Sequence, residues 1–290
     1  MCAATFRLDP DLLGLVDEVA LVLGGGGAGM GRSHCLQLAR AGCHVVVADL
    51  DPVGGRETVA EVRSLGRRGA FVETDALDAD SVGAAVDFAI AEFDRLDVQV
   101  NHVGGTVGSV PFLDYDDDDW DATVALNTKP VVFGSRAASL AMIEREIEGR
   151  IVNTASSSGI AAADSLAAYG AAKAAVIHLT KTLALELAQF GIRVNCIVPG
   201  THDVQGAGTP PGGVAKFLEA NRAASPLGRL GKPAETAGLA VFFASRLSGY
   251  VTGQSVLSDG GLLLTLNRAR RDGLPRAVRD LEGGRFSNIP

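Results

Sequence analysis

The sequence contains few cysteines, and none of them is spaced for a metal site or a disulfide framework. Cys2, Cys35, Cys43 and Cys196 form no CxxC pair and no Cys/His cluster, and the five histidines are scattered along the chain. This spacing argues against a zinc-binding motif, and we expect the last three cysteines to be buried free thiols. No metal site is predicted.

Long apolar runs and an excess of basic residues are also missing. No apolar stretch reaches the roughly 18 residues that a membrane span needs, and acidic residues precede the first apolar stretch, unlike the start of a secretory signal. The formal net charge is −8, from 26 basic and 34 acidic residues. We therefore expect a cytoplasmic protein whose main partner is neither nucleic acid nor an anionic membrane.

Glycine, by contrast, is abundant, with 36 of 290 residues, a share well above the roughly 7 % of average proteins. The glycines have no triplet period, which excludes a collagen-like rod, and 47 % hydrophobic residues supply ample material for a core. Six of the eight residues from Gly24 to Gly31 are glycines. Such a cluster predicts one place where the backbone approaches something very closely.

Apolar, β-branched runs alternate with longer helical patterns along the chain. The strands are expected at Val19–Leu23, His44–Asp49, Ala70–Thr74, Val98–Val100, Arg150–Ala155, Arg193–Val198 and Ser255–Ser258. The helices are expected at Gly31–Ala41, Val53–Leu65, Ser81–Phe93, Trp120–Glu148, Ala167–Phe190 and Glu235–Ala244, with a short amphipathic segment near Val214–Ala224. This alternation predicts an α/β fold, a Rossmann-type doubly wound parallel sheet of about seven strands with helices on both faces. Its ligand crevice lies at the carboxyl ends of the strands.

The glycine cluster follows a strand and opens a helix, which is the setting of a dinucleotide-binding loop. There, backbone N–H groups and the positive end of the helix dipole can hold a pyrophosphate, although a flexible turn is the alternative. The next strand ends on Asp49, where a carboxylate accepts hydrogen bonds from an adenosine ribose and repels a 2′-phosphate. We therefore expect NAD rather than NADP, with Arg32 pointing along its helix.

Tyr169 and Lys173 are four residues apart in a helical segment, so their side chains lie on one face, one turn apart. An ammonium beside a phenol lowers its pKa toward the range where it serves as a base. Ser156 ends an apolar strand 13 residues upstream, and Asn127 stands inside a helix, where asparagine is disfavoured unless it has a task. Alone, a YxxxK spacing occurs often by chance, and a surface pair is then the favoured interpretation.

In order and spacing, these motifs resemble those of the short-chain dehydrogenase/reductase family over about residues 17–261. GGGGAGMG at Gly24–Gly31 resembles TGxxxGxG, NHVG at Asn101–Gly104 resembles NNAG, and VNCIVPG and GYVTGQSVLSDGG resemble the two last strands. The resemblance implies a catalytic set of Asn127, Ser156, Tyr169 and Lys173. The cofactor-binding residues it implies are Gly25, Gly29, Met30, Gly31, Asp49, Asp75, Ala76, Asn101, Gly104, Tyr169, Lys173, Pro199, Gly200 and His202.

The resemblance also implies a role for each residue. Tyr169 exchanges a proton with the substrate oxygen, Lys173 lowers its pKa and holds the nicotinamide ribose, and Ser156 donates to the substrate oxygen. Asn127 anchors a water of a proton relay, and the backbone at His202 holds the cofactor's carboxamide, with the imidazole at the mouth of the crevice. A homotetramer, or else a dimer, is the assembly implied.

The chain departs from the family pattern around its glycine loop. Gly24 replaces the usual threonine, and His102 and Val103 replace asparagine and alanine. We expect the His102 imidazole to fill the space that the threonine leaves. Val204 replaces a further threonine, which removes a contact to the carboxamide. None of these changes touches the catalytic set.

The substrate is predicted to be a largely apolar secondary alcohol or ketone. Candidate pocket walls are Gly105, Thr106, Val107, Ser158, Ala163, Leu166, Thr201, His202 and Phe217, none of which can clamp an anion, although Lys216 is near in sequence. Two alternatives remain: an NADPH-dependent 3-oxoacyl (carrier-protein) reductase, disfavoured by Asp49 and by the acidic body, and a non-catalytic nucleotide-binding protein, which would need no activated phenol.

Residues 1–261 are expected to form one catalytic domain, with an irregular substrate loop at about 201–230. Residues 262–290 form a basic extension of net charge +3, which leaves −11 on the rest. This extension is expected either to be partly disordered or to fold over the acidic body or a neighbouring subunit. The acidic run Asp114–Asp121 is expected to solvate a turn and supply the first acids of the next helix rather than to bind a cation.

Overall fold

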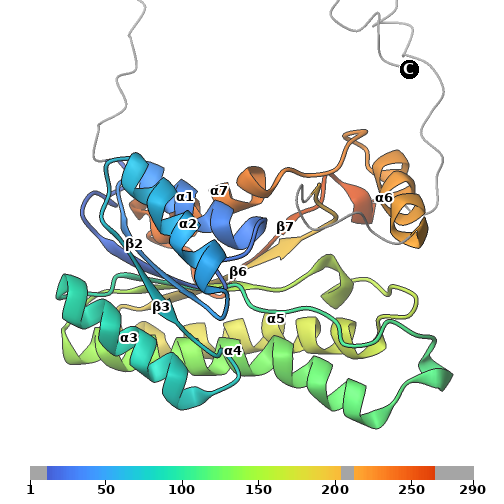
Figure 1. The fold of residues 1–290 in the computed structure, drawn as a ribbon, viewed down its shortest axis with the longest axis horizontal. Coiled ribbons are helices and arrows are strands. Elements are labelled where there is room, and N and C mark those ends of the chain that lie inside the picture. Colours follow the sequence, from blue (N-terminus) through green and yellow to red (C-terminus); the bar gives the residue numbers. More distant parts are fainter. Residues whose placement is uncertain (1–11, 204–211, 265–290) are drawn as a thin grey trace, which may run out of the picture.

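Seven strands form one parallel sheet in the computed structural model, which describes residues 12–203 and 212–264 (Figure 1). They are β1 (Val19–Leu23), β2 (His44–Asp49), β3 (Gly69–Glu73), β4 (Val98–Asn101), β5 (Arg150–Thr154), β6 (Arg193–Pro199) and β7 (Ser255–Ser258). Their order across the sheet is β3-β2-β1-β4-β5-β6-β7, and every neighbouring pair is parallel. The predicted doubly wound fold is thereby confirmed.

Helices cover both faces of this sheet, as parallel crossovers require. They are α1 (Met30–Arg40), α2 (Pro52–Ser64), α3 (Ala79–Phe93), α4 (Asp117–Glu144), α5 (Ala167–Leu187), α6 (Gly212–Ala224) and α7 (Pro233–Ala244). Figure 1 shows α1, α2 and α7 above the sheet and α3, α4 and α5 below it. Short 3₁₀ helices lie at Phe112–Asp114, Ser157–Gly159, Ala188–Phe190, Arg246–Ser248 and Leu262–Leu264.

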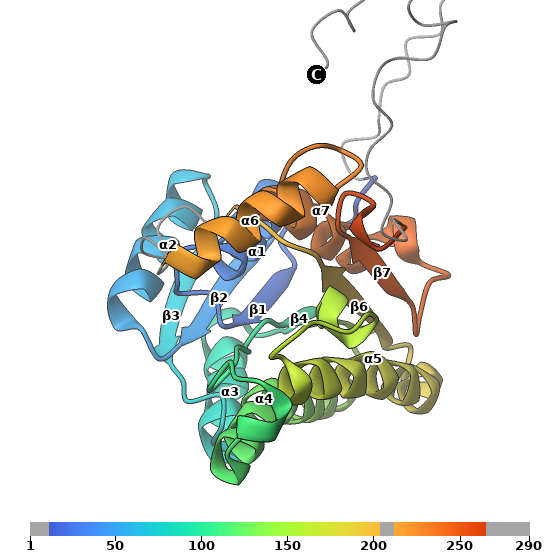
Figure 2. The ribbon, with the colours of Figure 1, turned by 90° about the vertical axis from the view of Figure 1, so that its right-hand side faces the viewer.

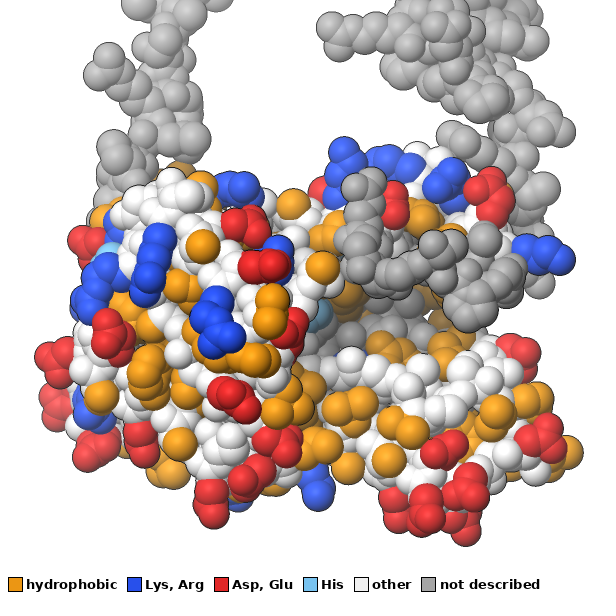
Figure 3. All heavy atoms as spheres, in the orientation of Figure 1, with side chains coloured by type: hydrophobic (Ala, Val, Ile, Leu, Met, Phe, Trp, Pro, Cys, Tyr) orange, Lys and Arg blue, Asp and Glu red, His pale blue; other side chains and the backbone are white. Residues whose placement is uncertain are grey.

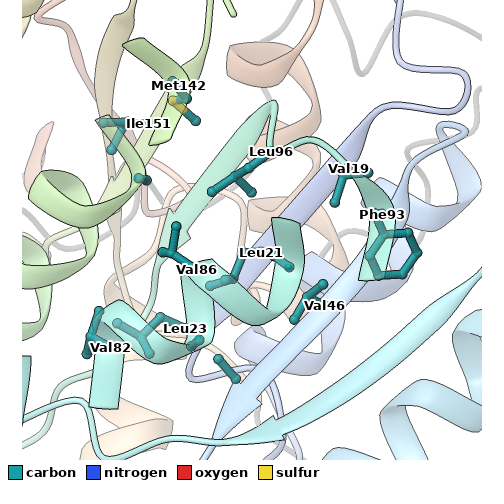
Figure 4. Packing of buried hydrophobic residues seen from close by; sticks show 14 of the residues in the cluster. Val19, Leu21, Leu23, Val46, Val82, Val86, Phe93, Leu96, Met142 and Ile151 are labelled. Carbon is teal, nitrogen blue, oxygen red and sulfur yellow. The ribbon is translucent and has the colours of Figure 1, made fainter. Parts of the chain in front are cut away.

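The strand β1 shows how the sequence builds two cores at once. All five of its residues are buried. Because successive side chains point to opposite faces, Val19, Leu21 and Leu23 pack into the core that includes Val86 of α3 (Figure 4). The residues between them belong to the core on the α1 and α7 side. This two-sided burial explains why the strand reads as a continuous apolar run.

Aspartates set the starts of three helices. Asp51, Asp78 and Asp116 each accept a hydrogen bond from the backbone N–H two residues further on, which caps α2, α3 and α4. The acidic run thus begins α4 three residues before the predicted start, and it forms an acidic cluster at the lower right of Figure 3. The expectation that this run supplies the first acids of the helix is confirmed.

The register aligns the carboxyl ends of the central strands, where the functional motifs stand. Leu23 pairs with Asn101, and Asn101 pairs with Asn153. The strand order reverses between β1 and β4, which is where a doubly wound sheet opens a crevice. Figure 2 shows α6 on this side of the molecule, and the surface is hollowed between the α1–α2 half and the α4–α5 half in Figure 3.

Within residues 12–203 and 212–264, no helix is both long and apolar enough to cross a membrane, and no cluster of three metal-ligating side chains occurs. Cys35, Cys43 and Cys196 are buried free thiols, as expected. Val204, part of the irregular loop and the extension from residue 265 onward lie outside the described residues.

Candidate active site

The glycine loop between β1 and α1 is packed so tightly that side chains are excluded at several positions. A Cβ on Gly31 would collide with the Gly24 carbonyl, and one on Gly25 would stand 2.7 Å from Cys35 Sγ. Gly24 and Gly29 have φ of +91° and +132°, which L-residues rarely adopt. The first turn of α1 carries no acidic side chain and no side-chain cap. Its free N–H groups therefore fit an anion such as a pyrophosphate.

Asp49 ties the loop to the next strand. Its Oδ2 accepts from Gly26 N–H at 2.8 Å and its Oδ1 from Asp51 N–H at 3.0 Å. Arg32 turns away toward α2, where it forms ion pairs with Glu57 at 2.9 Å and Glu61 at 3.2 Å. The guanidinium is thus neutralised by two carboxylates instead of standing free beside Asp49.

Two cavities follow each other along this crevice. The first cavity, of about 320 Å³, lies under the glycine loop and is lined by Met30, Gly31, Asp49, Asp75, Ala76 and Gly104, among others. The second cavity, of about 150 Å³, is lined by Met30, Gly104, Ser156, Tyr169, Lys173, Pro199 and Gly200, among others. Most of the predicted cofactor-binding residues therefore come together in one continuous cleft, whose residues fit an extended dinucleotide.

Four predicted cofactor residues line neither cavity. Gly25 and Gly29 shape the turn of the loop. The Asn101 amide is buried in a network, donating to Ser135 Oγ at 3.1 Å and Asn153 Oδ1 at 2.8 Å. It ties β4 to β5 and α4, and this structural role was not predicted.

His202 is the fourth predicted cofactor residue that lines neither cavity. The prediction that its imidazole lies at the mouth of the crevice is wrong. Its imidazole is 8 % exposed, and Nδ1 lies 2.9 Å from the Gly200 carbonyl while Nε2 lies 2.5 Å from Thr236 Oγ1. A carbonyl only accepts, so Nδ1 carries the proton and Nε2 accepts from Thr236. Burial lowers the pKa of His202. The neutral ring fastens the end of β6 to α7.

Tyr169 and Lys173 meet Ser156 at the end of β5. Lys173 is 4 % exposed, and its Nζ donates to the Thr154 carbonyl at 3.1 Å. Its Nζ lies 5.7 Å from the centre of the Tyr169 ring, while a hydrogen bond joins Tyr169 to Ser156. The expected helix face thus presents both side chains to one cavity.

The pKa values differ from the expectation for this pair. Burial raises the pKa of Tyr169, and its hydrogen bond with Ser156 opposes the rise. Burial lowers the pKa of Lys173 to about 8. The Lys173 amine donates to Thr154 and lies over the Tyr169 ring, and the prediction that it lowers the Tyr169 pKa stays a prediction.

Asn127 braces the loop beside the catalytic residues. It is fully buried in α4, accepts from Gly105 N–H at 3.2 Å, and donates to the carbonyls of Gly105 at 2.6 Å and Thr123 at 2.7 Å. A Cβ on Gly104 would collide with the Asn127 amide and stand 2.7 Å from Lys173 Nζ. Side-chain bulk is therefore excluded at Gly104. The predicted water relay at Asn127 stays a prediction.

A third cavity, of about 350 Å³, adjoins the catalytic residues. Its walls include Ser156, Tyr169 and Gly200, which also line the second cavity. The remaining walls are Ser157, Ser158, Ala161, Ala162, Ala163, Leu166, Thr201, Phe217, Asn221, Leu262 and Leu263. Five of the nine predicted wall residues line this cavity. The other four, Gly105, Thr106, Val107 and His202, do not.

Sequence reasoning missed the contributions of Leu262 and Leu263. They belong to the segment predicted to be an extension beyond the catalytic domain, yet they form a 3₁₀ helix that lines the third cavity. Their apolar character directly after the closing glycines was the available signal. Asn221 was also missed, although it stands four residues after Phe217, on the same face of α6.

At Gly24, where the chain departs from the threonine of the family pattern, a neighbouring backbone carbonyl leaves no room for a side chain. A Cβ on Gly24 would stand 2.6 Å from the His102 carbonyl oxygen and 3.0 Å from Val103 Cγ2. The prediction that the His102 ring fills the space of a missing threonine stays a prediction. The ring lies beside Gly31, with Cδ2 3.3 Å from where a Cβ would stand.

Comparison with known proteins gives one family. A model described as enoyl-(acyl carrier protein) reductase matches residues 25–263. Cyclopentanol dehydrogenase from Comamonas sp. is 34 % identical over 255 residues, which are 86 % of this chain and 98 % of the relative. Cyclohexanol dehydrogenase from Rhodococcus sp. (strain TK6) is 36 % identical over 274 residues, with shares of 87 % and 98 %. The crystal structure of a short-chain type dehydrogenase/reductase from Mycobacterium marinum matches with a TM-score of 0.80 at 31 % identity, over 87 % of this chain and 98 % of that chain. The protein belongs to the short-chain dehydrogenase/reductase family of oxidoreductases.

Proposed function

We propose that this protein transfers a hydride between NAD and a largely apolar secondary alcohol or ketone, with Tyr169 as the proton-exchanging group. The observation that carries the proposal is the junction of the cavities. Ser156 and Tyr169 line both the second cavity, at the end of the dinucleotide cleft, and the third cavity, which is open to a substrate. A carbinol between the two would meet both hydroxyls.

A nicotinamide bound in the second cavity would supply the hydride acceptor or donor. The Ser156 hydroxyl would donate to the substrate oxygen and stabilise the charge that develops there. Because burial raises the Tyr169 pKa, the neutral phenol prevails near pH 7, which is the proton donor for ketone reduction. Alcohol oxidation needs the phenolate and so should be favoured by alkaline pH.

The choice of NAD over NADP rests on the surroundings of Asp49. Its carboxylate is fixed by two backbone N–H groups and lines the first cavity. A 2′-phosphate there would face a negative charge, while Arg32, the cation next to the loop, is held by two glutamates. Attraction of the phosphate by Arg32 would first require breaking those ion pairs.

Asp49→Asn should shift cofactor preference. The amide oxygen still accepts from Gly26, but the negative charge is gone, so the kcat/KM ratio of NAD over NADP should fall roughly tenfold or more. Initial rates with each cofactor at a fixed alcohol concentration give this ratio. Asp87→Asn, at an exposed acid on α3, serves as the control and should leave the ratio unchanged. An unaltered ratio in Asp49→Asn would remove the basis for NAD selection.

The third cavity supports an apolar substrate class. Alanines, leucines and Phe217 dominate its walls, and none of its lining residues within the described ranges is lysine or arginine. Lys216 on α6 is exposed and does not line it. Cyclic secondary alcohols, the substrates named for two relatives, would match these walls in chemistry.

A panel assay tests the proposal as a whole. Purified protein with NAD and cyclic or linear secondary alcohols should produce the near-ultraviolet absorbance of reduced nicotinamide. The family model's description makes an acyl thioester the second candidate, so 3-oxoacyl and enoyl thioesters with NADPH belong in the same panel. Turnover of thioesters alone would favour that candidate, and turnover of nothing in the panel would contradict both.

A further inference from the structure

His102 stands where the two cofactor cavities meet. It follows the end of β4, and it is among four residues that line both the first and the second cavity, with Met30, Val103 and Gly104. Any molecule that runs from one cavity into the other must therefore pass this imidazole. Asparagine is the residue that the family pattern has here, so the ring is a feature of this chain.

The ring is held from two sides. His102 Nδ1 lies 3.2 Å from Thr154 Oγ1, and the Thr154 carbonyl in turn accepts from Lys173. His34 of α1 packs against the ring at 4.8 Å between centroids with planes 67° apart. His34 is fully buried, and neither of its ring nitrogens has a hydrogen-bond partner among the described residues.

A buried imidazole without partners costs stability that an apolar side chain of similar size would not. Its edge-to-face contact places His34 as a support for His102. With Nδ1 held by Thr154, the remaining polar atom of the ring is Nε2, and the one side-chain hydrogen bond of His102 among the described residues is that of Nδ1. The Thr154 hydroxyl can donate or accept, so Nε2 can serve as acceptor or donor.

The charged and titratable groups that face His102 are His34, Lys173 and His202. Burial of the ring, and after it the proximity of these groups, hold the pKa of His102 well below its usual value. The ring is therefore neutral near pH 7. A contact that it makes with a ligand is a hydrogen bond rather than an ion pair.

We propose that His102 is a cofactor-binding residue that recognises, through Nε2, the central pyrophosphate–ribose part of a dinucleotide where it crosses from the first cavity to the second. This inference rests on the proposed function, because it requires a dinucleotide in the cleft. It adds a side-chain contact to a stretch of the cleft that is otherwise lined by the loop backbone, Met30, Val103 and Gly104.

Two substitutions separate this role from a structural one. In His102→Asn the amide occupies the place of Nδ1 and keeps the bond to Thr154 but cannot reach the position of Nε2. In His102→Gln the amide reaches the position of Nε2 but loses the bond to Thr154. The readout is NADH binding, measured by fluorescence titration. The matched ligand is AMP, which by the proposed function would occupy the first cavity alone, and its binding is measured by calorimetry.

We expect His102→Asn to weaken NADH binding about tenfold, with AMP binding and thermal unfolding as in the wild type. His102→Gln should bind NADH more tightly than His102→Asn. His178→Gln, at an exposed histidine on α5, is the control and should bind as the wild type does.

Three results would overturn the inference. NADH binding by His102→Asn equal to that of the wild type would show that Nε2 makes no contact. Weaker binding by His102→Gln than by His102→Asn would assign the effect to the Thr154 bond, as would an equal loss of AMP binding. A fourth result, failure of the wild type to bind NADH, would contradict the proposed function itself. The three results above, in a wild type that binds NADH, contradict only the role of His102.

Discussion

Tyr169→Phe is expected to lower kcat/KM for a secondary alcohol by roughly 10²- to 10⁴-fold, the usual contribution of a positioned acid–base group. The substitution removes the hydroxyl that is hydrogen-bonded to Ser156 and keeps the ring that packs over Lys173. NADH affinity should change little, because the loss concerns a proton that moves only during reaction. Initial rates and a fluorescence titration on the same samples measure both quantities.

The control for this variant is Tyr250→Phe. Tyr250 is fully exposed, lies near the start of β7 and is not among the walls of the first, second or third cavity. The substitution removes the same hydroxyl from a tyrosine outside the three cavities, so the rates of this variant should equal those of the wild type. Wild-type turnover in Tyr169→Phe would exclude this residue from the chemistry.

Lys173→Met should stabilise the protein near neutral pH and change how its stability depends on pH. The folded-state pKa of Lys173 is about 8, below the ordinary 10.5. Between these values the unfolded chain holds a proton that the folded chain has released, so this lysine makes stability rise with pH. Across this range, Lys173 raises the free energy of unfolding by about 3 kcal/mol in total. The Lys173→Met variant lacks this contribution.

Urea unfolding gives the free energy of unfolding of the wild type and of Lys173→Met at pH 8 and at pH 10.5. The contribution of Lys173 is the difference between the two proteins in how far this free energy rises. Subtraction is needed because Arg193, with a pKa lowered to about 10, and Cys43, with a pKa raised to about 12, also titrate in or near this range. Lys181→Met, at an exposed position of the same helix, should show the wild-type dependence. Equal pH dependence in Lys173→Met and the wild type would mean that burial does not shift this amine.

The fold was predictable because its strands are buried on both faces. A strand such as β1, whose five residues are all buried, has no polar alternation, and the run of apolar residues marks it with almost exact ends. Helix starts were less accurate. The helix α4 begins at Asp117 rather than at Trp120, because its capping residue, Asp116, lies before the first apolar residue of the helix.

Side-chain directions at the site were harder to predict. Spacing placed Tyr169 and Lys173 on one helix face, but it could not show that Lys173 reaches back to the Thr154 carbonyl. Likewise His202 stands two residues after Gly200, and its ring is turned inward by a contact with Thr236 of α7. These contacts join residues far apart in sequence, so a local pattern carries no trace of them.

The most direct test of the account follows the hydrogen itself. An alcohol carrying deuterium at its carbinol carbon is incubated with NAD and the wild-type protein, and the reduced cofactor is analysed by mass spectrometry. Hydride transfer from the carbinol carbon to NAD predicts one deuterium in each reduced cofactor formed, with the matching ketone in equal amount. Ketone formation without a labelled cofactor, or a reduced cofactor that carries only solvent hydrogen, would contradict hydride transfer in this cleft.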